Sequence, residues 1–290
     1  MSDQAERLRE MMKNSESSPK STCRTIAVTS GKGGVGKTSL TVNLALALSR
    51  SHKKTVMIDA DLGLANVDVM MGVSPPHTLS EMVRGERTLE EILLPIGEYL
   101  EIVPGGSGIG ELADLDQDSL AVLVRQLSSL EQRADFILVD TGAGISNVVL
   151  NFVLAAQEVL VVTTPEPTSV TDAYAIIKAI DRRSPETTVR LVVNMADSEG
   201  IARDVAQKLI MIVERFLQIK VEYLGFIERD GNVSRSILQQ QPLLDAYPYS
   251  IASRRINLLA GFLLAEATNP PPPTSFFSRL AGFFKNKGDA

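Results

Sequence analysis

The sequence predicts an α/β fold with a mostly parallel, twisted sheet flanked by helices on both faces. Short apolar runs of strand length alternate along the chain with longer segments whose apolar residues recur at helical spacing. Such alternation is typical of right-handed β–α–β crossovers. The first apolar run also leads directly into a glycine-rich turn followed by a helix. With 290 residues, 44% of them hydrophobic and 22% charged, the chain suits one large domain with short appendages.

Composition excludes several classes of protein. The net charge of −6 argues against general coating of nucleic acid, and no specific nucleic-acid partner is expected. The single cysteine, Cys23, cannot form an internal disulfide framework and indicates a reducing compartment. Residues 1–20 are polar and charged rather than signal-like, and no apolar run reaches the length of a membrane span. A cytoplasmic location is therefore expected.

The stretch from Gly31 to Thr38 reads GKGGVGKT and satisfies the phosphate-binding pattern G-x-x-x-x-G-K-[ST]. A strand is expected before it, over 25–29, and a helix after it, over 39–48. Backbone N–H groups of such a loop point at one anion, and the helix N-terminus adds partial positive charge. Lys37 is expected to reach the β- and γ-phosphates, and the Thr38 hydroxyl to hold Mg²⁺. The residues expected to bind the nucleotide here are Gly33, Gly34, Val35, Gly36, Lys37, Thr38 and Ser39.

Carboxylates end two further expected strands. The strand over 55–59 ends in Asp59, with Asp61 close behind, and the buried strand over 136–140 ends in Asp140. The carboxyl ends of parallel strands lie in the crevice where open α/β sheets bind ligands. There, such carboxylates can support Mg²⁺ and orient an attacking water, although they could also cap a helix or face solvent. The predicted metal set is Thr38, Asp59, Asp61 and Asp140.

The remaining elements continue the alternation without a second catalytic cluster. We expect short helical pieces over 66–94, a strand over 101–104, helices over 119–133, 168–182 and 201–217, strands over 159–163, 189–193 and 221–227, and further helix to 267. A flexible turn over 141–144 could sense a γ-phosphate. His52 and His77 lack metal-ligand companions and are expected at the surface.

Both ends of the chain differ from the central domain. Residues 1–22 read as a short amphipathic helix and a linker, 23–268 as the nucleotide-binding domain, and 269–290 as a polyproline spacer followed by an amphipathic helix. The apolar face of that last helix is expected to consist of Phe276, Phe277, Leu280, Ala281, Phe283 and Phe284. An aromatic stripe with basic flanks, outside the apparent core, suits a membrane surface. The alternative is that it packs back on the domain or on a partner.

Lys32, directly after the first glycine, makes GKGGVGKT resemble the deviant Walker A motif of the MinD/ParA family of P-loop ATPases, and the resemblance covers Thr25 to roughly Ala267. It implies an ATP-dependent homodimer that encloses two ATP molecules with Mg²⁺ and hydrolyses them slowly. Lys32 would then reach the other subunit's phosphates, and Asp61 would position the hydrolytic water. It further implies that Glu166 lies in the segment that meets the other subunit and that Asn194 reads adenine.

Within that family, residues 3–9 (DQAERLR) resemble the N-terminal motif of the flagellar-number regulators, the FlhG or FleN branch. The resemblance implies an arm that stimulates a signal-recognition-type flagellar GTPase through Asp3, Gln4, Leu8 and Arg9. It also implies that the C-terminal helix is an ATP-dependent anchor to the anionic inner face of the cytoplasmic membrane, at a cell pole. Further partners would be flagellar C-ring proteins or a flagellar transcriptional regulator. The chain departs from its relatives over 227–230, which lack their proline-containing turn.

Three alternatives share this scaffold. An iron–sulfur carrier needs cluster-ligating cysteines, which Cys23 alone cannot supply. A DNA-partition ATPase needs a basic surface for non-specific DNA, and the amphipathic tail disfavours it. A MinD-like division-site selection ATPase is disfavoured by the N-terminal motif and is the second reading of the function.

Overall fold

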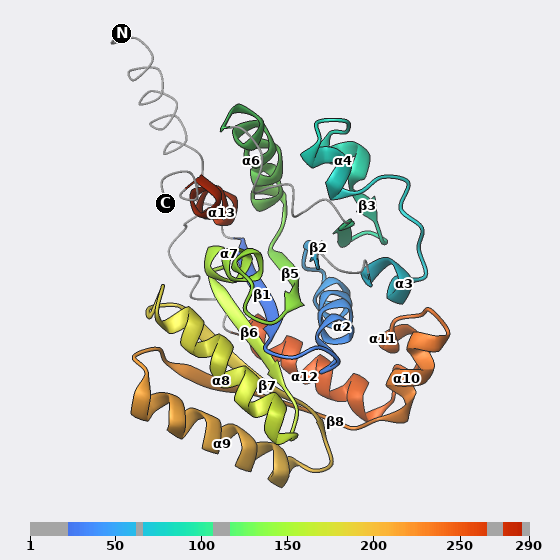
Figure 1. The fold of residues 1–290 in the computed structure, drawn as a ribbon. Coiled ribbons are helices and arrows are strands. Elements are labelled where there is room, and N and C mark those ends of the chain that lie inside the picture. Colours follow the sequence, from blue (N-terminus) through green and yellow to red (C-terminus); the bar gives the residue numbers. More distant parts are fainter. Residues whose placement is uncertain (1–22, 62–65, 107–116, 266–274, 286–290) are drawn as a thin grey trace.

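The fold is built on one eight-stranded sheet (Figure 1). The computed structural model describes residues 23–61, 66–106, 117–265 and 275–285. Strand order is β3-β4-β2-β5-β1-β6-β7-β8, and every pairing is parallel except that of β3 with β4. The strands are β1 (Arg24–Ser30), β2 (Thr55–Ala60), β3 (Leu94–Pro95), β4 (Leu100–Val103), β5 (Phe136–Ala143), β6 (Glu158–Thr163), β7 (Thr188–Ala196) and β8 (Val221–Glu228).

Helices cover both faces of the sheet, which confirms the predicted fold class. One face packs against α2 (Lys37–Arg50), α3 (Val67–Met71), α11 (Leu243–Ala246) and α12 (Ile251–Ala265), with α10 (Gly231–Leu238) beside α11. The other face packs against α4 (Leu79–Val83), α5 (Leu89–Ile92), α6 (Gln117–Arg133), α7 (Asn147–Ala155), α8 (Pro167–Asp181), α9 (Glu199–Phe216) and α13 (Phe276–Lys285). Because the central strands are apolar on both sides, each face of the sheet buries its own core.

Two elements differ from the sequence-based expectation. Strand β5 continues through Ala143, so the turn expected over 141–144 is largely strand. The sequence does not predict helix α7, because NVVLNFVLA is short and apolar except for two asparagines, so its helical period is weakly marked. It begins at Ser146, whose hydroxyl accepts a hydrogen bond from the Val149 N–H at 3.3 Å.

Helix α13 lies in the core, contrary to the expectation that the C-terminal aromatic stretch stands apart from it. It packs between α6 and α7, and Phe276, Phe277 and Leu280 are buried there together with Ala281 and Phe284. Phe283 is half-buried, and the Phe284 ring meets Phe152 of α7 edge-on at 6.4 Å. In this structure the apolar face of α13, which the sequence suggested would meet a membrane, is therefore buried against α6 and α7.

The start of α13 is held by a side chain of α6. The Glu131 carboxylate accepts hydrogen bonds from the Ser275 hydroxyl at 3.2 Å and the Phe277 N–H at 3.3 Å. Burial raises the pKa of Glu131. A carboxylate at a helix N-terminus stabilises that helix, so Glu131 fixes where α13 begins on the domain.

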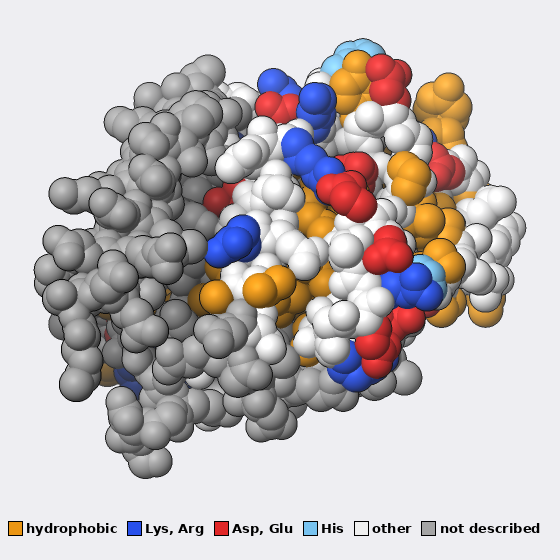
Figure 2. Space-filling view, turned by 90° about the horizontal axis from the view of Figure 1, so that it is seen from above, with side chains coloured by type: hydrophobic (Ala, Val, Ile, Leu, Met, Phe, Trp, Pro, Cys, Tyr) orange, Lys and Arg blue, Asp and Glu red, His pale blue; other side chains and the backbone are white. Residues whose placement is uncertain are grey.

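The surface shows no single-sign charge field on the side seen in Figure 2, where acidic and basic side chains alternate over the described residues. This mixture of signs is in keeping with the small net charge of −6. Among the described helices, none has both the length and the apolar content needed to cross a bilayer.

Candidate functional site

The phosphate-binding loop lies where β1 ends and α2 begins, as predicted. Gly36 has φ 84°, a left-handed conformation that favours glycine, and a Cβ there would collide with the Asn194 side-chain amide. A Cβ on Gly31 would collide with the backbone of Asp172 in α8. No side chain fits at either position, and the absence of a Cβ lets the loop pack closely against β7 and α8.

Lys37 and Thr38, the first residues of α2, converge on Asp140 at the end of β5. The Lys37 ammonium lies 2.9 Å from Asp140 Oδ1, and the Thr38 hydroxyl donates to Asp140 Oδ2 at 2.7 Å. Thr41, one turn further along α2, donates to Asp140 Oδ1 at 3.0 Å. The Asp140 carboxylate is fully buried and Lys37 nearly so. A buried charge needs such pairing, and this arrangement supplies it.

Asp59 and Asp61 lie at the end of the neighbouring strand β2. Asp59 is buried and accepts a hydrogen bond from the Asp61 N–H at 3.1 Å. Burial, with the neighbouring Asp140 carboxylate, raises the pKa of Asp59 to about 7. Asp61 is half-buried and lines the cavity beside Gly142 of β5. Asp59 is therefore a buried carboxyl group that is easily neutralised, whereas Asp61 is placed to act on a bound molecule.

The predicted metal residues adjoin one another but do not form a cage of carboxylates. In the part of the chain that the structure describes, no three His, Cys, Asp or Glu side chains form a group that could hold a metal. Magnesium bound with a nucleotide takes one or two protein ligands and fills its other positions with phosphate oxygens and water. The Thr38 hydroxyl and the Asp140 carboxylate fit that role.

Lys32 points away from this cluster and towards α8. Its ammonium lies 2.8 Å from Glu166 Oε2 and 3.2 Å from the Thr168 hydroxyl of the same chain. The Lys32 and Glu166 side chains are both substantially exposed. An ion pair this exposed contributes little stability, so it can exchange for another partner at small cost.

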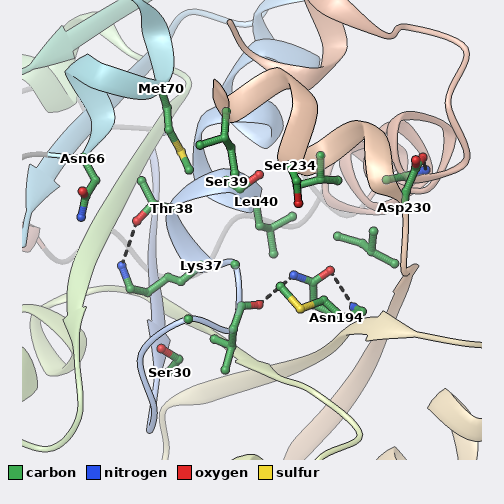
Figure 3. A pocket seen from close by; sticks show the side chains of 18 of the residues that line it. Ser30, Lys37, Thr38, Ser39, Leu40, Asn66, Met70, Asn194, Asp230 and Ser234 are labelled. Carbon is green, nitrogen blue, oxygen red and sulfur yellow. Dashed lines mark hydrogen bonds between the residues drawn. The ribbon is translucent and has the colours of Figure 1, made fainter. Parts of the chain in front are cut away.

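A cavity of about 530 Å³ extends from the phosphate-binding loop to β7, β8, α10 and α12. In the close view, Lys37 and Thr38 lie near one end and Asn194 near the middle, with Asp230 beyond it (Figure 3). The Asn194 amide donates to the Val35 carbonyl at 2.7 Å, and its oxygen accepts the Met195 N–H at 2.9 Å. These two bonds fix the orientation of the Asn194 side chain inside the cavity.

The far wall of the cavity is the part of the site to which the sequence assigned no individual roles, although residues 227–230 stood out for lacking the proline-containing turn of relatives. The lining residues there are Met195, Ile227, Glu228, Arg229, Asp230, Val233, Ser234, Ile237, Ala252 and Ile256. They come from β7, β8, α10 and α12, which are far apart in sequence and carry no motif. Met195, with φ 56°, offered no sequence signal for its left-handed backbone.

The structure brings together the predicted phosphate residues, the predicted metal residues and Asn194. Asp3, Gln4, Leu8 and Arg9 lie outside the described residues. The C-terminal aromatic residues are placed by α13 between α6 and α7.

Comparison with known proteins gives the family of the chain. A family model described as an AAA domain matches residues 23–193. Antiactivator FleN of Pseudomonas aeruginosa is 43% identical over 235 residues, covering 81% of this chain and 84% of the relative. The flagellum site-determining protein YlxH of Helicobacter pylori is 36% identical over 299 residues, covering 97% of this chain and 98% of the relative.

Among solved structures, the septum site-determining protein MinD of Pyrococcus horikoshii, complexed with Mg-ADP, has a TM-score of 0.70 at 26% identity. The similarity covers 86% of this chain and all of that one. The chain therefore belongs to the MinD/ParA family of P-loop ATPases.

Proposed function

We propose that this protein is a nucleotide-driven switch ATPase: it binds ATP, dimerises, associates with the inner face of the cytoplasmic membrane at a cell pole, and is released on hydrolysis. Its output is the number and placement of flagella. The observation that carries the proposal is the cavity at the phosphate-binding loop, lined by Lys37 and Thr38, whose side chains both contact the buried Asp140 carboxylate. The names of the relatives FleN and YlxH support the flagellar output.

The residues of this chain divide the work of hydrolysis. The loop N–H groups and the Lys37 ammonium bind the phosphates, which requires Lys37 to exchange its Asp140 contact for phosphate oxygens. Thr38 and Asp140 would hold magnesium, which supplies charge neutralisation at the phosphates when it is bound with ATP. Asp61, at the cavity edge, orients the attacking water. The fixed acceptor oxygen of Asn194 suits the amino group of adenine.

Dimerisation supplies the remaining positive charge. Lys32 leaves Glu166 and Thr168 and contacts the phosphates bound by the second subunit, where negative charge develops during hydrolysis. The exposed ion pair of Lys32 with Glu166 makes this exchange inexpensive. Hydrolysis then depends on the dimer, which makes the ATPase slow in the monomer.

Membrane association requires α13 to leave the domain. Its aromatic face is buried between α6 and α7 in this structure, so the same side chains cannot contact lipid at the same time. We infer that the ATP-bound dimer favours the released helix, which then lies in the plane of an anionic membrane. Two helices on one dimer bind far more tightly than one because the second binds at high effective concentration.

The proposed partner is a signal-recognition-type flagellar GTPase, stimulated by the N-terminal arm. A flagellar transcriptional regulator or C-ring proteins are further partners consistent with the relatives' names. We assign Asp3, Gln4, Leu8 and Arg9 of the arm to the GTPase, and we expect Gln4 to matter most for its stimulation.

A peptide spanning Met1 to Asn14 is expected to accelerate GTP hydrolysis by this partner at least about tenfold, and the Gln4→Ala peptide is expected to have no effect. GTP turnover with each peptide measures this, with a Lys13→Ala peptide as the control that retains stimulation. If neither the parent peptide nor the full chain accelerates the GTPase, division-site selection becomes the better function, in keeping with the similarity to MinD structures.

A further inference from the structure

The end of β8 and the two residues that follow it, together 227–230, form much of the far wall of the cavity. Their sequence, Ile-Glu-Arg-Asp, contains no proline that would restrict the backbone. A wall that contacts a ligand must nevertheless be held in place before binding, because ordering it on binding lowers affinity. Contacts from outside the cavity supply that rigidity.

The strongest of these contacts is made by Arg255 of α12. Its Nε lies 3.0 Å and 2.9 Å from the two carboxylate oxygens of Glu228, and its Nη2 lies 2.8 Å from Glu228 Oε1. The guanidinium also stacks over the Phe226 ring, 4.1 Å from the centroid. Fork-shaped contact and stacking on an aromatic face are both specific to arginine. Arg255 therefore fixes the position and orientation of the last residues of strand β8.

The Arg255 pair is better sheltered than the other ion pair at this wall. The side chains of Arg255 and Glu228 are 30% and 21% exposed, whereas Arg229 and Asp197 are 63% and 70% exposed. Exposed pairs contribute little. Arg255 also lies 3.9 Å from Glu199 in the first turn of α9, so it links β8, α12 and the helix that follows β7.

Two further bonds close the wall around the same segment. The Arg229 N–H donates to the Ala196 carbonyl at 2.9 Å, which joins the segments that follow β7 and β8. The Asp230 carboxylate accepts the Asn232 N–H at 2.9 Å and the Ala252 N–H at 3.2 Å, which joins α10 to α12. Arg255 is not among the residues that line the cavity, whereas its partner Glu228 is.

We propose that Arg255 is a positioning residue for the nucleobase: through Glu228 it holds the wall against which the base packs, without touching the nucleotide. The proposal rests on the proposed function only in that the cavity binds a nucleotide. It assigns base affinity, and not phosphate affinity, to the contact among Arg255, Glu228 and Phe226. Removing the contact loosens the base end of the cavity while the loop at Gly36, Lys37 and Thr38 keeps its own bonds.

The test compares two ligands that share the phosphate chain and differ in the base. Binding of ATP and of inorganic triphosphate, each with magnesium, is measured by calorimetry on the full chain. Arg255→Ala is expected to weaken ATP binding about tenfold and to leave triphosphate binding unchanged. Arg255→Lys keeps the positive charge but loses the fork-shaped contact, and we expect it to weaken ATP binding less than Arg255→Ala does. Arg203→Ala removes an exposed ion pair with Glu199 and serves as the matched control with unchanged binding.

Each outcome decides between distinct conclusions. Equal weakening of ATP and triphosphate by Arg255→Ala would indicate a general structural defect and overturn the proposal. Unchanged ATP binding in Arg255→Ala would overturn it as well. If the unmodified chain binds neither ligand, the proposed nucleotide function fails at the start, which is a different result from failure of the positioning role.

Discussion

Replacing Lys37 by alanine is expected to abolish measurable ATP binding and to lower ATP turnover by at least about 100-fold. Lys37 is the buried cation at the start of α2, next to the loop N–H groups that would bind the phosphates. Without it, the phosphates lose the ammonium charge of Lys37 and the buried Asp140 carboxylate loses its ion-pair partner. Calorimetric titration with ATP and a phosphate-release assay measure the two effects.

The control for this prediction is Lys32→Ala, which removes a lysine of the same loop that faces α8 instead of Asp140. The Lys32 variant should still bind ATP as a monomer while losing turnover that depends on the dimer. Circular dichroism must show that the Lys37 variant is folded, since Asp140 then lacks its buried partner. A folded Lys37→Ala protein with unchanged ATP affinity would contradict the assignment of the cavity.

Deleting residues 276–290 is expected to destabilise the domain by several kcal/mol and to lower its Tm by about 10 °C. Burying each Phe or Leu side chain is worth about 1.5–3 kcal/mol, partly offset by the entropy of ordering the helix. Helix α13 buries several such side chains against α6 and α7. Domains of this size lose about 2–4 °C in Tm for each kcal/mol.

Deleting only residues 286–290 leaves α13 intact and is the matched control, with an unchanged Tm expected. Thermal unfolding followed by circular dichroism in ATP-free buffer measures both deletions. If the longer deletion leaves the Tm unchanged, α13 contributes nothing to the fold and behaves as a free tail.

The phosphate end of the site was predictable because its signal is local. Gly36, Lys37 and Thr38 lie within one loop, and each residue type is required by the geometry found there. Asp59 and Asp140 were also predictable, since the ends of adjacent parallel strands meet at one edge of the sheet.

The base end was not predictable because it is assembled from four elements with no common pattern. Glu228 and Arg255 lie on β8 and α12, and only the packing of α12 beside the sheet edge brings them together. The sequence showed that residues 227–230 lack a proline-containing turn, but it did not show which contacts hold this segment in place instead.

The position of α13 was not predictable for a different reason. An aromatic stripe suits equally a membrane surface and a groove between two helices, because both remove apolar area from water. Hydrophobic patterning alone cannot choose between them. The groove is formed by α6 and by α7, and α7 itself lacked a recognisable period.

In the proposed cycle, ATP moves α13 from the domain to the membrane. The most direct test is liposome co-sedimentation of the Asp61→Ala variant, in which ATP binds but the attacking water is not oriented. With saturating ATP and anionic vesicles, the variant is expected to be dimeric and to sediment with the vesicles, and with ADP to stay monomeric in the supernatant. An Asp61→Ala protein that remains monomeric and unbound at saturating ATP would contradict the claim.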